Sequence, residues 1–219
     1  MEGVSEDQLI EALEEARGAQ IIEELPRVVG LYQFTHVLVQ HTLLDELSML
    51  RRVRMHARVA QALKELYGSD VEAHAAELAH HFGQASTVLG PQKSVQYSLA
   101  AGEQALSIYA YEDALAHFQR AFAVKQDQPL DAETARLLFG LGRTQGAAGE
   151  VPQAWASLRR AFNYYVELGD VAQAVAVTEY PLFYVPGLTQ TTQLATQALS
   201  MVAPTPTRPG NCCAAMVCC

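Results

Sequence analysis

The segment from Val95 to Ala161 reads VQYSLAAGEQALSIYAYEDALAHFQRAFAVKQDQPLDAETARLLFGLGRTQGAAGEVPQAWASLRRA, and it contains one pattern twice. Four positions in its first half recur 40 residues later (102 to 142, 114 to 154, 118 to 158 and 121 to 161). These repeat-packing residues are Gly102, Ala114, Phe118, Ala121, Gly142, Ala154, Leu158 and Ala161. Small residues let two helices approach closely, and a large apolar residue fills the space beside them. The pattern therefore predicts two consecutive helical hairpins that stack on each other.

The spacing of these positions resembles the tetratricopeptide repeat. Gly142 falls on the first helix of the repeat, Gly149 on its turn and Leu158 on its second helix. In the first unit Tyr109 stands where the family has its turn glycine. The family period is about 34 residues, so the longer offset predicts a lengthened link at residues 125–131. Two ordinary amphipathic hairpins in an all-helical domain would give the same pattern, and that alternative changes the expected function little.

The composition limits the kinds of protein that this chain can be. With 219 residues, 50% of them apolar, the chain can bury a sizeable core. Its net charge of −9 argues against a dominant nucleic-acid-binding surface, which needs clustered Lys and Arg. No apolar run approaches the roughly 20 residues that span a bilayer, and the acidic start is unlike a signal peptide. Residues 1–211 contain no cysteine, as expected in a reducing compartment. We therefore predict a cytoplasmic protein with no membrane partner.

Residues 1–47 are predicted to form a partial winged-helix unit of helix, β-hairpin and helix. Ser5 stands at an N-cap position with Gln8 at capping-box spacing. Residues 20–25 and 31–35 read as two short strands. A helix followed by a hairpin resembles the back half of a winged-helix domain, and such a unit is marginal in water by itself. The helix after the hairpin carries an apolar stripe of Val37, Leu38, Leu43, Leu44 and Leu47.

Residues 48–90 are predicted to form a helical linker, and residues 91–203 the repeats. Ser48 is placed to cap a helix of the linker that runs to about Tyr67. The inward face of this helix is predicted to consist of Leu50, Val53, Ala57, Ala60 and Leu63. A further helix is expected at residues 71–82, followed by a loop up to the first repeat. The end of the repeat region is interpreted as a third, irregular unit, and about three units are the minimum for a stable stack.

Three segments of the N-terminal half resemble a linker in large bacterial signalling ATPases. They are YQFTHVLVQHTLLDEL (32–47), RRVRMHARVAQAL (51–63) and ELAHHF (77–82). In the LuxR-type transcriptional regulators of the STAND class, a similar linker joins a winged helix to a C-terminal tetratricopeptide array. With the repeats, the resemblance covers residues 5–203. The P-loop, the Walker B acid and the DNA-reading helix-turn-helix of those proteins do not occur in this sequence, so neither ATPase activity nor DNA binding is expected of this chain.

The resemblance implies a non-catalytic regulatory module that binds a protein or small-molecule effector on the repeat surface. In full-length relatives this module is linked to an ATPase domain. Its concave face, built from first helices such as 97–108 and 135–145, is the predicted binding surface. Two alternatives remain open: the C-terminal region of an ATPase-linked class III nucleotide cyclase, or a free-standing tetratricopeptide adaptor. An upstream cyclase domain would favour the first, and a downstream helix-turn-helix would favour the transcriptional regulator.

No catalytic, cofactor or metal site is predicted. Four possible ligands occur at helical spacings: His74, Glu77, His80 and His81. The zinc-protease order His-Glu-x-x-His is absent, so packing and surface roles are favoured. A basic helix face, either solvated or in contact with a phosphate, consists of Arg51, Arg52, Arg54 and Arg58. Gly140 and Gly142 lie in a repeat helix with no strand before them, which indicates close packing and not a dinucleotide loop.

Residues 204–219 differ in composition from the rest of the chain. All four cysteines of the sequence lie here: Cys212, Cys213, Cys218 and Cys219. Adjacent cysteines are poorly placed to chelate one ion, so no metal site is predicted in this tail. Codons permitted for the tail, read two bases out of frame, encode an ordinary start to another repeat helix. We interpret the irregular tail as an out-of-frame end and expect the natural repeat array to continue beyond it.

Overall fold

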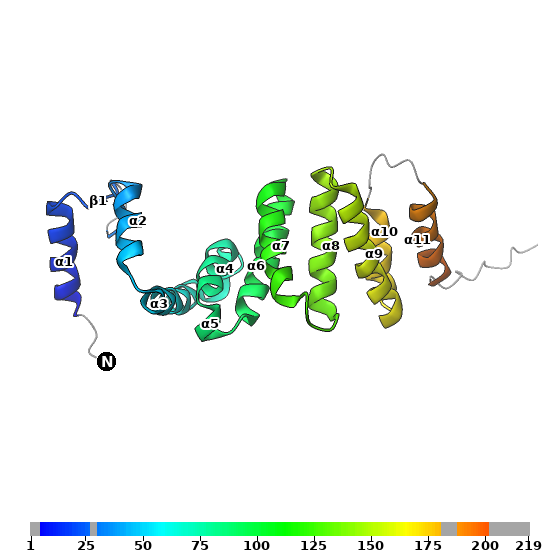
Figure 1. The fold of residues 1–219 in the computed structure, drawn as a ribbon, viewed down its shortest axis with the longest axis horizontal. Coiled ribbons are helices and arrows are strands. Elements are labelled where there is room, and N and C mark those ends of the chain that lie inside the picture. Colours follow the sequence, from blue (N-terminus) through cyan, green and yellow to red (C-terminus); the bar gives the residue numbers. More distant parts are fainter. Residues whose placement is uncertain (1–4, 27–29, 181–187, 202–219) are drawn as a thin grey trace, which may run out of the picture.

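The structure is a computed structural model that describes residues 5–26, 30–180 and 188–201. The cysteine-rich tail lies outside these residues. The described part is mostly α-helical, with one two-stranded antiparallel sheet. The elements follow one another along the long axis of the molecule, from α1 at one end to α11 at the other (Figure 1). The predicted fold class, a mostly α stack of helical hairpins preceded by a small β-hairpin, is confirmed.

The first unit consists of α1 (Glu6–Gly18), β1 (Ile22–Glu24), β2 (Tyr32–Phe34) and α2 (Val37–Glu46). The predicted capping box is confirmed. The Ser5 hydroxyl accepts a hydrogen bond from the Gln8 backbone N–H, and the Gln8 side chain accepts one from the Ser5 N–H. The strands pair antiparallel with Ile22 opposite Phe34. The sequence therefore located both the start of the first helix and the hairpin.

No side chain before Ala57 is buried within the described residues. The apolar stripe predicted for α2 forms a helix, but Val37, Leu38 and Leu43 on it are exposed. Leu50, which was predicted to face inward, is also exposed. It lies in the first turn of α3, before Ala57 and Ala60, which are the buried residues of that helix. The N-terminal unit therefore has no core of its own.

The linker consists of α3 (Met49–Tyr67), the 3-10 turn η1 (Gly68–Asp70), α4 (Ala75–Gln84) and α5 (Ser86–Leu89). Its core is formed by Ala60, Leu78, Ala79, Phe82 and Tyr97. Two boundaries predicted from the sequence were wrong. Residues 71–74 form turns, so the second helix starts later than expected. Most of the loop expected after residue 82 is helical, because α4 continues past Gly83 and α5 follows it.

The repeat region contains α6 (Gln92–Ser107), α7 (Tyr111–Lys125), α8 (Ala132–Ala147), α9 (Val151–Leu168), α10 (Val171–Glu179) and α11 (Leu188–Met201). Each helix packs against the next, and Figure 1 shows them side by side along the stack. Two apolar cores run through it, and Phe122 on α7 packs against both. Ala198 on α11 is buried, whereas Leu199 beside it is exposed.

Candidate functional site

All eight repeat-packing residues are buried inside the stack. Phe118 on α7 lies between glycines of two other helices. A methyl group added at Gly102 on α6 would stand 2.7 Å from its ring, and one at Gly140 on α8 would stand 2.5 Å from it. In the second hairpin a methyl group at Gly142 would stand 2.6 Å from Cδ2 of Leu158. Because these residues hold helices together from within, a binding site must lie elsewhere.

The lengthened link between the hairpins is closed by an ion pair. Nζ of Lys125, the last residue of α7, lies 2.6 Å from the carboxylate of Asp131 and 3.2 Å from that of Glu133. The Asp131 carboxylate also caps α8 by accepting hydrogen bonds from the N–H and the hydroxyl of Thr134, at 2.8 and 2.7 Å. These contacts fix the second hairpin on the first.

The turn of the first hairpin departs from the pattern of the second. Tyr109 has a φ of +62°, and Gly149 at the equivalent turn has a φ of +80°. This left-handed conformation favours glycine, and in other residues it costs roughly 1 to 2 kcal/mol. The Tyr109 side chain is 75% exposed, so burial does not offset the cost. Its ring lies 6.2 Å from that of Tyr111, measured between centroids, in an edge-to-face arrangement.

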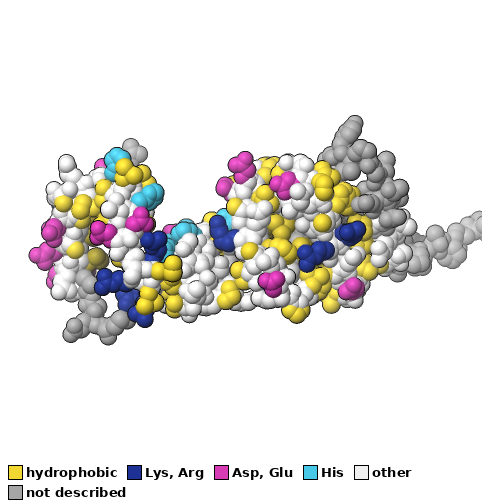
Figure 2. Space-filling view, in the orientation of Figure 1, with side chains coloured by type: hydrophobic (Ala, Val, Ile, Leu, Met, Phe, Trp, Pro, Cys, Tyr) yellow, Lys and Arg dark blue, Asp and Glu magenta, His cyan; other side chains and the backbone are white. Residues whose placement is uncertain are grey.

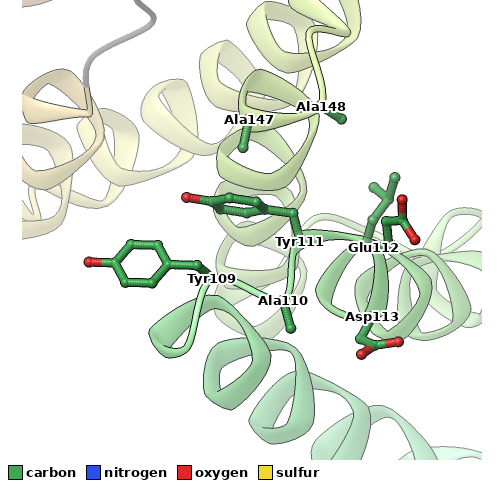
Figure 3. A pocket seen from close by; sticks show the side chains of 8 residues that line it. Tyr109, Ala110, Tyr111, Glu112, Asp113, Ala147 and Ala148 are labelled. Carbon is green, nitrogen blue, oxygen red and sulfur yellow. The ribbon is translucent and has the colours of Figure 1, made fainter.

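A pocket of about 580 Å³ opens beside this turn. It is lined by Tyr109, Ala110, Tyr111, Glu112, Asp113, Leu115, Ala147 and Ala148. Figure 3 shows the two tyrosine rings on one side of the turn, with Glu112 and Asp113 directed to the other side. Tyrosine offers apolar contact area and a polar tip at a low cost in side-chain entropy.

An ion pair joins equivalent positions on the first helices of the two hairpins. Arg143 on α8 pairs with Glu103 on α6 at 3.2 Å, and the two residues are 40 positions apart. The guanidinium of Arg143 also lies 5.3 Å from the centroid of the Phe139 ring. The backbone carbonyl of Arg143 accepts a hydrogen bond from the Tyr180 hydroxyl at 2.7 Å. Burial raises the pKa of Tyr180, and the charge of Tyr111 raises it further. These contacts connect α6, α8 and the end of α10.

Three histidines gather where α3 meets α4. The Nδ1 atoms of His56 and His81 lie 3.0 Å apart, so one must donate a proton that the other accepts. The rings of His56 and His80 are 5.5 Å apart between centroids. Burial lowers the pKa of His56, and the charges of His80 and Arg52 lower it further. Burial also lowers the pKa of His81, with His80 and His56 adding to the shift.

The other residues of the histidine-rich spacing pattern have different surroundings. His74 stacks on the ring of Tyr67, with centroids 3.7 Å apart. Glu77 accepts a hydrogen bond from the Tyr67 hydroxyl at 2.6 Å. In the described part of the chain, no group of three or more His, Cys, Asp or Glu residues is arranged to hold a metal ion. Of the basic face, Arg52 bonds to the Leu44 carbonyl and so joins α3 to α2.

The histidine pair predicts a loss of stability in mild acid. Because folding lowers the pKa of His56 and His81 from 6.5, the unfolded chain takes up protons first as the pH falls. The contribution of these histidines to the free energy of unfolding should be complete above pH 6.5 and decrease as the pH falls below it. Thermal denaturation followed by circular dichroism between pH 8 and 5 measures this change.

A matched pair of variants identifies the histidines responsible for that change. We expect His56→Gln to flatten the pH dependence of the melting temperature, and His41→Gln, on the exposed surface of α2, to leave it unaltered. Burial also lowers the pKa of His117, so this residue should contribute a residual pH dependence of stability in both variants. Equal pH dependence in the parent and in His56→Gln would contradict this assignment.

Within the described residues, no helix is both long and apolar enough to cross a bilayer. Comparison of the chain with protein-family models, curated proteins and solved structures found no match.

The pocket lined by Tyr109 and Tyr111, called the aromatic pocket below, and the cluster of His56, His80 and His81 were not predicted from the sequence. The sequence feature that pointed to the pocket was Tyr109 at the position of a turn glycine. The histidine cluster could not be predicted, because its residues come from two helices, α3 and α4, that come together only in the folded structure.

Proposed function

We propose that this chain is a non-catalytic interaction module that binds a segment of a partner protein in the pocket beside the α6–α7 turn. The observation that supports this most is Tyr109, an exposed aromatic residue held in a strained turn where the next hairpin has Gly149. Strained backbone is retained where the surrounding structure or a function requires it. Tyrosine is enriched in protein interfaces and among the residues that dominate their affinity.

In this proposal the module is a regulatory region of a cytoplasmic LuxR-type signalling ATPase. The sequence resemblance over residues 5–203 supports this, and so does the N-terminal unit that lacks a core. Large apolar side chains exposed on that unit are Leu9, Ile10, Leu31, Phe34, Val37, Leu38 and Leu43. Apolar surface of this kind is typical of a protein contact. In a linker between an ATPase domain and the repeats, it would pack on the ATPase domain, and partner binding at the pocket would bias the ATPase between its states.

The docking site can be tested with peptides selected against the intact chain from a random display library. Fluorescence anisotropy would give their affinities for the parent and two variants. Removing an aromatic anchor should weaken binding about tenfold or more, so we expect this of Tyr109→Ser. Leu168→Ser changes a similarly exposed apolar residue at the end of α9 and should bind like the parent. Equal binding by Tyr109→Ser and the parent would remove the support for this pocket as the docking site.

The link to an ATPase has a separate test. Sequencing the native locus and its transcript on both sides of this reading frame would identify the neighbouring domains. An upstream P-loop ATPase with a downstream helix-turn-helix is the expected result. An upstream cyclase would favour the nucleotide-cyclase alternative, and a transcript that holds this frame alone would favour the free-standing adaptor.

A further inference from the structure

Two neighbouring pockets beside α3, α4 and α7 share Gln84 in their linings and together form a basin. One, of about 300 Å³, is lined by Arg52, His56 and Gln84 among others. The second, of about 200 Å³, shares Gln84 and is lined by His80 and Arg120. The rings of His56 in the first pocket and His80 in the second lie 5.5 Å apart between centroids, so the two pockets are adjacent. Figure 2 shows histidine together with Lys and Arg side chains at the hollow between α2 and α7.

The basin collects positive charge in a chain whose net charge is −9. We name its four basic lining groups the cationic basin: Arg52, His56, His80 and Arg120. Arg52 has one carboxylate partner, Asp45, at 3.4 Å. Glu77 acts weakly on His81, and Asp113 acts on His117, which stands one turn before Arg120. Burial lowers the pKa of His56, and His80 and Arg52 lower it further; burial also lowers the pKa of His81, and His80 and His56 lower it further.

Arg52 supplies a second, independent observation. Its Nε–H is buried and has no acceptor in the described structure. His117, which lies one turn before Arg120 on α7, also has a buried Nδ1 without a partner. Buried polar atoms nearly always have a hydrogen-bond partner, so each exception needs an explanation such as a bound ion or ligand. An oxyanion in the basin would supply the acceptor that Arg52 lacks.

We infer that the cationic basin binds the phosphate group of a small, soluble, phosphate-bearing ligand. The guanidinium groups of Arg52 and Arg120 suit the geometry of phosphate oxygens. The imidazole of His56, whose pKa burial lowers, can take up a proton as the anion arrives, and a phosphate monoester itself titrates near pH 6. The two pockets together have a size that suits a small ligand. This inference is independent of the proposed peptide site, which involves other residues.

Isothermal titration calorimetry of the intact chain with inorganic pyrophosphate tests the inference. We expect binding about tenfold tighter or more at pH 6 than at pH 8, with net proton uptake revealed by buffers of different ionisation enthalpy. Arg120→Gln should weaken binding about tenfold or more, since it removes a charged hydrogen-bond donor. Arg120 is exposed on α7, so this variant is expected to fold. Arg159→Gln removes the same charge from the exposed surface of α9 and should bind like the parent.

Several outcomes would overturn the inference. They are the absence of pyrophosphate binding at millimolar concentrations, tighter binding at pH 8, or equal losses in Arg120→Gln and Arg159→Gln. Tighter binding of a single-stranded oligonucleotide than of pyrophosphate would contradict the assignment to a small ligand. Tyr109→Ser should leave pyrophosphate binding unchanged, so failure at the basin and failure at the peptide pocket are separable.

Discussion

Gly140→Ala is expected to lower the free energy of unfolding by about 2 kcal/mol, because severe overpacking of a core costs about 3 kcal/mol and helix propensity returns about 1. The new methyl group would stand 2.5 Å from the Phe118 ring. That ring cannot move away, because Gly102 on α6 also lies against it. Even a methyl group added at Gly102 would stand only 2.7 Å from the ring. Urea denaturation followed by circular dichroism measures the change.

A control and a compensating variant separate this effect from glycine replacement in general. Gly18, the last residue of α1, has nothing within 4 Å of an added methyl group. We therefore expect Gly18→Ala to be neutral or slightly stabilising. Phe118→Leu shortens the opposing side chain, so it should cost less in the Gly140→Ala background than in the parent. A double-mutant cycle without coupling would show that the predicted contact does not limit the packing.

The repeat positions and local caps were predictable because they depend on short-range rules. The 40-residue offset located both hairpins, and Ser5 with Gln8 located the first helix. The lengthened link was also located correctly, at residues 125–131 between α7 and α8. What the sequence did not reveal there is the ion pair that closes it, since Lys125 and Asp131 read as ordinary polar residues.

Burial in the N-terminal part was not predictable from periodicity. An apolar stripe identifies which face of a helix is apolar, but it does not establish that another element covers that face. Val37 and Leu38 lie on such a stripe and are exposed, and Leu50 in the first turn of α3 is exposed as well. The same stripe pattern gives buried Ala57 and Ala60, because α4 packs there.

The candidate sites required the three-dimensional structure because they combine distant residues. The aromatic pocket joins the α6–α7 turn to Ala147 and Ala148 at the end of α8. The cationic basin joins Arg52 on α3 to Arg120 on α7. The basic spacing on α3 did suggest contact with a phosphate, but only packing brings the histidines of α4 beside it.

Asp131→Ala is expected to destabilise the protein by about 2 kcal/mol. Loss of an N-cap costs about 1 kcal/mol. Loss of the ion pair adds up to about 1 more, discounted because the Asp131 side chain is 51% exposed and solvent screens the charge. Lys125, only 6% exposed, would keep Glu133 as its carboxylate partner at 3.2 Å. Thermal and urea denaturation at pH 7 measure the loss, and Asp170→Ala is the matched control, because Asp170 caps α10 without a lysine partner.

Acid titration separates the charge of Asp131 from its role as a cap. Burial by itself would raise the pKa of Asp131, but the pair with Lys125 and the hydrogen bonds from Thr134 lower it to about 2, from 3.8. A carboxyl with a lowered pKa contributes stability that is complete above pH 3.8 and is lost as the pH falls towards 2. The parent should therefore lose more stability than Asp131→Asn over this interval. If Asp131→Ala cost no more than Asp170→Ala at pH 7, the ion pair would contribute nothing measurable, and the cap alone would hold the second hairpin in place.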